Sequence, residues 1–180
     1  MKPQHLLIAA TLFSSAALAG PPASLAPLLD SVQQRLEIAP KVALTKWDNH
    51  KPVLDAPRES EVMGAAGMLA AEYKVDAALA EQFFAAQIEA SKLVQYGLLT
   101  QWNAMGSAPA TPRVDLAKEI RPQLDVLQKQ LMERLAAFAP SRNDPQCPRW
   151  LATAIEARQA DALQRTALVR ATGELCASPS

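Results

Sequence analysis

Three polar side chains interrupt the apolar stripe of the longest predicted helix, over residues 76–105. At 100° per residue, Gln87, Ser91 and Gln95 fall within the arc of the predicted buried face. The apolar members of that arc are Phe84, Ile88, Val94, Leu98 and Trp102. A buried polar side chain without a partner costs about 1 to 3 kcal/mol, so this arc requires polar neighbours or a ligand. The pattern alone leaves open whether these residues link helices or bind a ligand.

Three basic residues lie at the margins of other predicted apolar faces. Arg35 and Lys46 are 11 positions apart, a spacing of three helical turns that returns to nearly the same azimuth. Arg121 flanks a stripe of leucines and isoleucine further along the chain. Basic side chains at such margins often extend to water, and arginine also binds carboxylates with two parallel hydrogen bonds. Each of the three residues is compatible with either arrangement.

The other residue types exclude several classes of chemistry. The only histidines are His5 and His50, too few for a credible zinc or iron site, and His50 is predicted to lie in an exposed loop. We find no nucleophile elbow, phosphate-binding glycine loop or dinucleotide fingerprint. With 18 basic and 18 acidic residues the chain offers no field to attract nucleic acid. We therefore predict no cofactor and no metal, and binding of a small anion or electrostatic catalysis on one.

The first residues indicate an export signal. Met1 and Lys2 precede an apolar run over residues 6–18, which ends in the small-residue pattern Ala17-Leu18-Ala19. The run is shorter than the ~20 residues of a membrane span, so we predict cleavage after Ala19 and no membrane attachment afterwards; an uncleaved anchor is the alternative. Residues 1–19 would be the signal peptide, and residues 20–180 one domain in the periplasm or outside the cell.

Two cysteines remain after that cleavage, Cys147 and Cys176. Export delivers them to a compartment in which disulfides persist, so we predict that they are bonded to each other. A bridge closing a loop of this size contributes about 3 to 4 kcal/mol in the chain-entropy model. The alternative is a pair of inert thiols.

The elements that must position these residues are predicted to be helices throughout. Apolar residues recur at helical spacing and β-branched alternation is absent, so we predict an all-α, single-domain bundle of five to six helices with one disulfide. Pro40 is expected to kink or break the first helix, which begins near Ser24, and Pro122 to lie near the start of the fourth helix or to kink it. On the helix over 76–105, Glu89 and Lys92 are predicted to be solvated. The later helices are expected over about 58–73, 76–105, 114–138 and 149–175.

An ordered set of segments between residues 35 and 95 resembles the helical, AroQ-type chorismate mutases, specifically their secreted (gamma) class. The segments are 35–39, 45–47, 55–59 and 83–95. The steps are 11 from Arg35 to Lys46, 12 to Arg58, 33 to Ser91 and 4 to Gln95. The signal peptide and the two late cysteines fit the secreted class, whereas the similarity thins beyond Trp102, so Arg121 is matched less closely.

The resemblance implies a chorismate mutase that rearranges chorismate to prephenate without metal or cofactor. It implies that Arg35, Arg58 and Arg121 clamp the two substrate carboxylates, and that Lys46 and Gln95 contact the ether oxygen. Contacts to the ring hydroxyl are expected from Asp55 and Glu59, and support of a carboxylate from Ser91. A homodimer with each site inside one chain is also implied. The alternatives are a non-catalytic exported binding protein for a small aromatic dicarboxylate, and a purely structural polar stripe.

Overall fold

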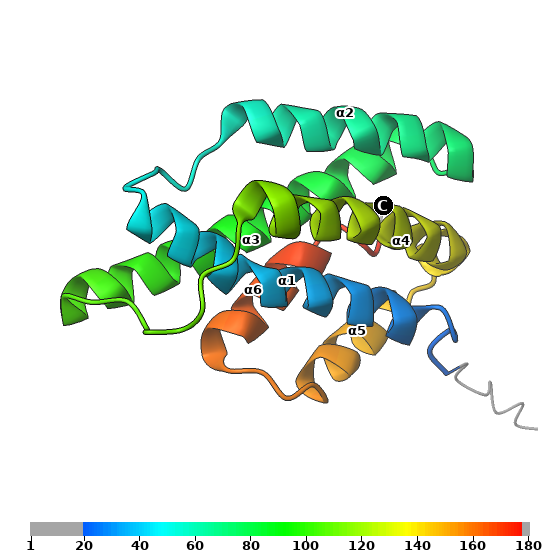
Figure 1. The fold of residues 1–180 in the computed structure, drawn as a ribbon. Coiled ribbons are helices and arrows are strands. Elements are labelled where there is room, and N and C mark those ends of the chain that lie inside the picture. The colour runs from blue at the N-terminus through cyan, green and yellow to red at the C-terminus, as the bar shows by residue number, and fades with distance from the viewer. Residues whose placement is uncertain (1–19, 178–180) are drawn as a thin grey trace, which may run out of the picture.

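Helices are the regular elements throughout residues 20–177, the part of the chain that the computed structural model describes (Figure 1). This confirms the predicted all-α class. The predicted signal peptide and its cleavage site lie outside the described residues. None of the helices in the described part is long and apolar enough to cross a membrane. The elements are α1 (Leu25–Asp48), α2 (Ala56–Tyr73), α3 (Ala77–Met105), the π-helical turn η1 (Leu116–Ile120), α4 (Arg121–Phe138), the 3-10 turn η2 (Ala139–Ser141), α5 (Cys147–Glu156) and α6 (Ala162–Thr172).

Helix α1 runs unbroken through Pro40, so of the kink or break predicted there the break is wrong. A proline inside a helix removes one hydrogen bond and crowds the preceding turn, at a cost of about 3 kcal/mol. On both sides of it α1 buries apolar residues, including Leu36, Ala39 and Ala43. Burial of these side chains offsets the cost and keeps the two halves in one helix. Ser24 stands at the N-cap as expected, but its side chain makes no capping hydrogen bond.

Helices α2 and α3 begin at capping aspartates, close to their predicted starts. Asp55 accepts a hydrogen bond from the Arg58 backbone N–H at 3.3 Å, and Asp76 accepts one from the Leu79 N–H at 2.9 Å. Such caps satisfy amide groups that have no partner inside the helix. Helix α3 ends at Gly106, whose φ of 73° suits a residue without a side chain.

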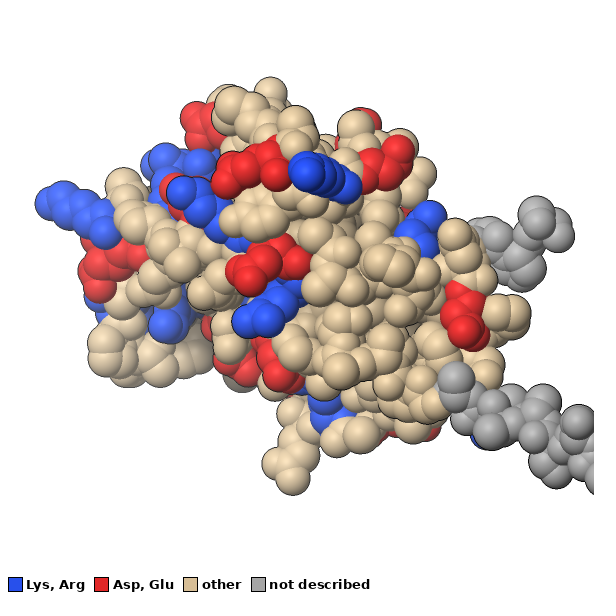
Figure 2. Space-filling view, turned by 90° about the vertical axis from the view of Figure 1, so that its right-hand side faces the viewer, with Lys and Arg blue, Asp and Glu red and all other residues tan. Residues whose placement is uncertain are grey.

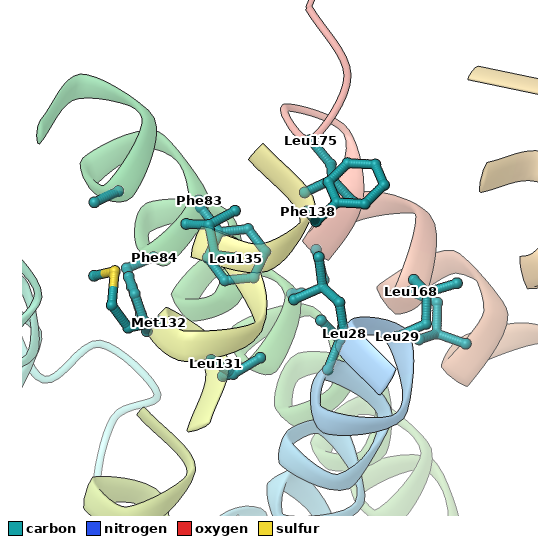
Figure 3. Packing of buried hydrophobic residues seen from close by; sticks show 14 of the residues in the cluster. Leu28, Leu29, Phe83, Phe84, Leu131, Met132, Leu135, Phe138, Leu168 and Leu175 are labelled. Atoms are coloured by element: carbon teal, nitrogen blue, oxygen red, sulfur yellow. The ribbon is translucent and has the colours of Figure 1, made fainter. Parts of the chain in front are cut away.

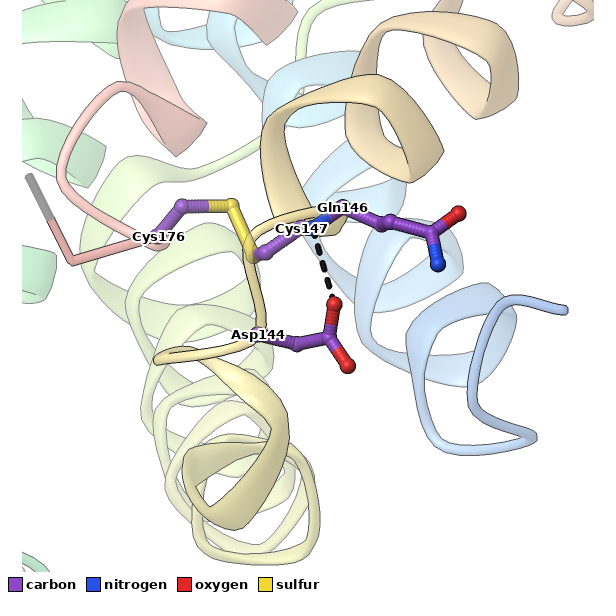
Figure 4. Close-up of a disulfide and its surroundings, with 4 residues drawn as sticks. All are labelled: Asp144, Gln146, Cys147 and Cys176. Carbon is purple, nitrogen blue, oxygen red and sulfur yellow. Dashed lines mark hydrogen bonds between the residues drawn. A yellow bond between two sulfur atoms is a disulfide. The ribbon is translucent and has the colours of Figure 1, made fainter. Parts of the chain in front are cut away.

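The single last helix predicted over residues 149–175 is wrong, because the chain folds back between α5 and α6. A straight helix of that length would be about 40 Å long. The Cα atoms of Cys147 and Cys176 are instead 5.7 Å apart, in the predicted disulfide, which the structure confirms (Figure 4). Residues 157–161 make the turn, and Asp161 caps α6 by accepting from the Gln164 N–H at 2.8 Å.

Helix α3 is the central element and packs against α1, α2 and α6. Gly97 allows the close approach of α6, because a Cβ atom there would lie 2.9 Å from the methyl groups of Leu163. Aromatic and leucine side chains fill the space between α1, α3, α4 and the chain around α6 (Figure 3). Figure 2 shows acidic and basic side chains interspersed on one face of the molecule. The largest fully buried side chains include Leu28, Leu29, Phe83, Phe84, Leu131, Met132, Leu135, Phe138 and Leu168.

Candidate functional site

A pocket lies between α1, α2, α3 and the start of α4, and it contains every site residue predicted from the sequence. Those residues come from four separate stretches of chain, and the packing of α3 on α1 and α2 brings them together. The polar lining is Arg35, Lys46, Asp55, Arg58, Glu59, Ser91, Lys92, Gln95 and Arg121. The apolar lining is Val42, Val53, Val62, Ile88, Leu116 and Leu124.

Two cations of this pocket, Arg35 and Lys46, are buried, and we refer to them as the inner pair. Arg35 is 7% exposed, and its Nη1 donates a hydrogen bond to the backbone oxygen of Gln87 at 3.2 Å. Burial, followed by the like charge of Arg58, lowers the pKa of Arg35 to about 10. Neither its hydrogen bond nor its charged neighbour supplies a negative charge, so within residues 20–177 this guanidinium has no counter-ion.

Lys46 is equally buried at the last turn of α1, where the helix dipole favours a cation. Its ammonium donates a hydrogen bond to the backbone oxygen of Val53. Desolvation lowers the pKa of Lys46 below its ordinary value; the charges of Asp55 and Glu59 oppose this shift without cancelling it. Arg35 and Lys46 lie on the same face of α1, as predicted. Both are more deeply buried than was expected for residues at the margin of the apolar face.

The other two predicted cations, Arg58 and Arg121, are more exposed, and we refer to them as the mouth pair. Their side chains are 21% and 40% exposed respectively. Arg58 pairs with Asp125 at 2.6 Å, and a nitrogen of Arg121 lies 3.6 Å from an oxygen of Asp55. Partial burial opposes the charge of Arg58, but its hydrogen bonds, chiefly to Asp125, outweigh this and raise the pKa. The mouth pair therefore already has carboxylate partners.

The three polar residues of α3 divide between the two alternatives left open by the sequence. The Gln87 side chain lies outside the pocket, and its Nε2 donates to the Ala171 oxygen of α6 at 2.7 Å. Ser91 and Gln95 line the pocket, with Gln95 Nε2 donating to Ser91 Oγ at 3.2 Å. Within residues 20–177, the buried Oε1 atoms of both Gln87 and Gln95 lack a hydrogen-bond partner. Gln87 links helices through its Nε2 atom, whereas Gln95 is a residue of the pocket lining, so its unused acceptor lies beside the pocket.

Lys92 is a pocket residue that the sequence analysis placed wrongly, on the solvated face of α3. Its side chain is 16% exposed, and its ammonium lies 2.7 Å from Glu89 and 3.4 Å from Glu59. The hydrogen bond to Glu89 is the main cause of the raised pKa of Lys92. A long aliphatic stem lets a lysine at the edge of a polar face reach a neighbouring site. The sequence feature that pointed to the pocket was the position of Lys92 directly after Ser91, a predicted site residue.

The site as a whole is arranged to bind a small anion. Five basic and two acidic side chains line the pocket, an excess of three positive charges. Desolvated cations stabilise negative charge more strongly than solvated ones, because the surrounding dielectric is low. In the described part of the chain, no group of three or more histidine, cysteine, aspartate or glutamate residues is placed to hold a metal ion. The geometry suits electrostatic and orientational chemistry on an anion that carries at least two charges.

Comparison with known proteins agrees with this arrangement. The family model described as chorismate mutase type II matches residues 26–96, which include all the predicted site residues except Arg121. The secreted chorismate mutase of Mycolicibacterium smegmatis is 30% identical over 84% of this chain and 86% of its own. The chorismate mutase structure from Burkholderia phymatum is 43% identical, with a TM-score of 0.83, over 86% of this chain and 97% of that one.

A more distant likeness concerns the fold alone. The secreted chorismate mutase of Yersinia pestis superimposes with a TM-score of 0.70 at 22% identity, over 85% of this chain and 95% of that one. The likenesses to the mycobacterial and Burkholderia proteins extend over most of both chains, including the helices that follow the matched segment. The chain belongs to the type II chorismate mutase family.

Proposed function

We propose that the chain is an exported chorismate mutase that converts chorismate to prephenate. The observation that carries this proposal is the pocket, which two buried cations, Arg35 and Lys46, line together with Gln95. Chorismate is a dianion, and its rearrangement breaks an ether bond while forming a carbon–carbon bond in the same molecule. No proton transfer is needed, so a site with cations, amides and hydroxyls suffices.

Binding would act first by orientation. Arg35, Arg58 and Arg121 reach the pocket from α1, α2 and α4, and forked guanidinium groups bind carboxylates through paired hydrogen bonds. Holding both carboxylates brings the two reacting carbons into contact in the folded conformation of the substrate. This converts a rarely populated conformation into the bound one and lowers the activation free energy. Ser91 would support one of the carboxylates with its hydroxyl.

Stabilisation of the transition state would come from Lys46 and Gln95. Negative charge grows on the ether oxygen as its bond to carbon breaks, so donors aimed there bind the transition state more tightly than the ground state. The burial of Lys46 makes its charge effective, and its bond to the Val53 oxygen fixes its position. The Gln95 amide can present its nitrogen by rotating half a turn about its last side-chain torsion.

The acidic residues at the start of α2 would bind the ring hydroxyl. Asp55 caps the helix and Glu59 accepts a hydrogen bond from the Asp55 N–H at 3.4 Å, so both carboxylates are fixed. Lys92 holds Glu59 from the side of α3. This arrangement would orient the substrate ring and would repel a third anionic group at that position.

Export and assembly complete the proposal. Two relatives are named as secreted chorismate mutases, and the disulfide fits an oxidising compartment. We expect the signal peptide to be removed after Ala19, leaving the helical domain of residues 20–180 in the periplasm or outside the cell. A homodimer with one complete site in each chain is expected from the family resemblance.

The test is the loss of chorismate absorbance with purified protein of residues 20–180, in the presence of EDTA. We expect rapid conversion to prephenate, and a much slower rate in Arg58→Ala at chorismate concentrations below KM. Arg134→Ala, an exposed arginine outside the pocket, is the matched control and should keep the wild-type rate. A folded, disulfide-bonded sample that binds a bicyclic dicarboxylate without turning over chorismate would instead support the non-catalytic binding protein.

Light scattering on the same sample tests the expected homodimer. The molar mass should be twice that of one chain.

A further inference from the structure

The guanidinium of Arg58 is held by two carboxylates from different helices. Its Nη1 donates to Glu61 of α2 at 3.0 Å, and its Nη2 donates to Asp125 of α4 at 2.6 Å. Asp125 is 67 positions away in the sequence, so this contact exists only in the folded molecule. Arg58 lines the pocket, whereas neither carboxylate does. The two carboxylates therefore hold the guanidinium from outside the pocket.

The two hydrogen bonds restrain the guanidinium without using up its donors. A guanidinium carries five N–H groups in one plane, and two of them are engaged here. Bonds at two different nitrogens fix both the position and the rotation of that plane. The three remaining N–H groups are enough for a paired interaction with a ligand carboxylate. Arg58 is thus fixed in advance and still able to bind.

We propose that Asp125, assisted by Glu61, is a positioning residue that fixes Arg58 for the carboxylate of the bound substrate. The proposal rests on the proposed function only for the identity of that substrate. An arginine has several rotatable bonds, and a free side chain loses that freedom when it binds an anion. Asp125 removes most of this freedom before the substrate arrives, so that binding is tighter.

A purely stabilising ion pair would have a different signature. Asp125 and Glu61 are 56% and 63% exposed, and ion pairs between exposed groups contribute little to folding. Removing Asp125 should therefore leave the melting temperature nearly unchanged and act on binding. A competing role is also distinguishable: if Asp125 drew Arg58 away from the substrate, its removal would tighten binding.

The experiment compares Asp125→Ala with Asp30→Ala in purified protein of residues 20–180. Asp30 is a matched control, because it pairs with Arg158 at 2.7 Å, is 59% exposed and lies outside the pocket. We expect Asp125→Ala to raise KM about tenfold, with kcat within about threefold and the melting temperature within a few degrees. Asp30→Ala should leave KM unchanged. A KM for Asp125→Ala within twofold of the wild type, or below it, would overturn the proposal.

A double-mutant cycle tests whether Asp125 acts through Arg58. The readout is the Kd of a bicyclic transition-state-like dicarboxylate, measured by calorimetry in the wild type, both single variants and the double variant. Once Arg58 is alanine, Asp125→Ala should weaken binding no further. The same fold-change in both backgrounds would show that Asp125 acts independently of Arg58 and would refute the proposal.

A spectroscopic measurement separates this proposal from the proposed function. In nitrogen-15 NMR, rotation of the Arg58 guanidinium about its Cζ–Nη bonds should be slow in the wild type and fast in Asp125→Ala. Arg58→Lys assigns the resonance. A wild type that does not turn over chorismate but shows slow rotation refutes the enzyme while retaining the positioning role. Fast rotation in the wild type refutes the positioning role, whatever the activity.

Discussion

The inner pair and the mouth pair of the pocket are similar in charge but differ in what surrounds them. Arg35 and Lys46 are buried, bonded to backbone oxygens, and have lowered pKa values. Arg58 and Arg121 lie near the surface beside carboxylates, and the pKa of Arg58 is raised. The inner pair is therefore charged at a cost in folding free energy, whereas the mouth pair is already compensated.

This difference separates two tasks within one pocket. We expect a substrate dianion to add negative charge beside the inner pair, and the charge that develops on it to interact most strongly with buried donors. Arg58 and Arg121 already have carboxylate partners, and Asp125 holds Arg58 while donors remain for the substrate, so we expect the mouth pair to contribute to capture and orientation. We expect substitutions of the inner pair to lower kcat or alter stability, and those of the mouth pair to raise KM.

The largest effect is expected for Lys46→Ala. Loss of one preorganised donor to the ether oxygen should lower kcat/KM at least about 100-fold. Lys51→Ala, five residues later on the exposed loop, is the control and should keep wild-type kinetics. Steady-state chorismate kinetics measure both variants. A loss below about tenfold would assign the ether-oxygen contact to another residue and would weaken the distinction between the two pairs.

The second largest effect is expected for Gln95→Glu, which should change the pH dependence of activity. An amide donates a hydrogen bond at any pH, so wild-type activity should be nearly flat from about pH 5 to 8. At higher pH the wild-type activity should fall as Lys46 loses its proton. This fall should begin below the ordinary lysine pKa of 10.5, because the pKa of Lys46 is lowered. A glutamate must be protonated to donate, so the variant should lose roughly tenfold in kcat/KM per pH unit above its pKa.

The outcome that would count against Gln95 is easy to recognise. A wild-type rate that already follows a carboxylate-like titration between about pH 4 and 6 would remove the amide from the site. Gln87→Glu serves as the comparison, because Gln87 lies on the same helix but outside the pocket. Its substitution should affect stability through the bond to Ala171 without moving the pH optimum.

A smaller kinetic effect is expected at the mouth, for Arg121→Ala. Arg121 is 40% exposed and 3.6 Å from Asp55, so solvent screens its charge. We expect KM to rise about fivefold and kcat to stay within about twofold. Fluorescence or calorimetric titration with a dicarboxylate should give the same ratio in Kd. A fall in kcat comparable to that of Lys46→Ala would show that the two pairs do not differ in task.

The smallest expected effect concerns stability, and its sign is the informative part. Arg35→Met removes a buried charge and keeps an aliphatic chain of similar length, so the melting temperature should rise by about 2 to 4 °C, which corresponds to ~1 kcal/mol. The same substitution at Arg58, which loses two ion pairs, should leave it unchanged or lower it. We expect both variants to lose activity. A melting temperature for Arg35→Met below the wild type would show that the inner charge is not a cost.

Local periodicity predicted most of the helices and the polar arc of α3, because both depend on residues close in sequence. Gln95 and Ser91 were placed on the buried side correctly, whereas Lys92 was misplaced because azimuth ignores the length of a side chain. The turn at residues 157–161 was missed because it contains no glycine or proline, and its cue is the capping Asp161.

The contact between Arg58 and Asp125 could not be predicted from the sequence. Arg58 and Asp125 lie on helices whose relative placement depends on the whole core, and no spacing along the chain encodes their contact. The same holds for the desolvation of Arg35, which requires several helices to exclude water together. Sequence resemblance identified which residues meet in the pocket, but their electrostatic states emerge only from the packing.

The disulfide encloses a covalent ring from Cys147 to Cys176 that contains α5 and α6, and every residue lining the pocket lies outside that ring. The ring holds α6 behind α3 and restricts the unfolded chain. The covalent restraint on the unfolded chain and the residues that line the pocket therefore lie in separate stretches of sequence. Substitutions on the outer faces of α5 and α6 therefore leave the residues that line the pocket unchanged, while the covalent ring continues to restrict the unfolded chain.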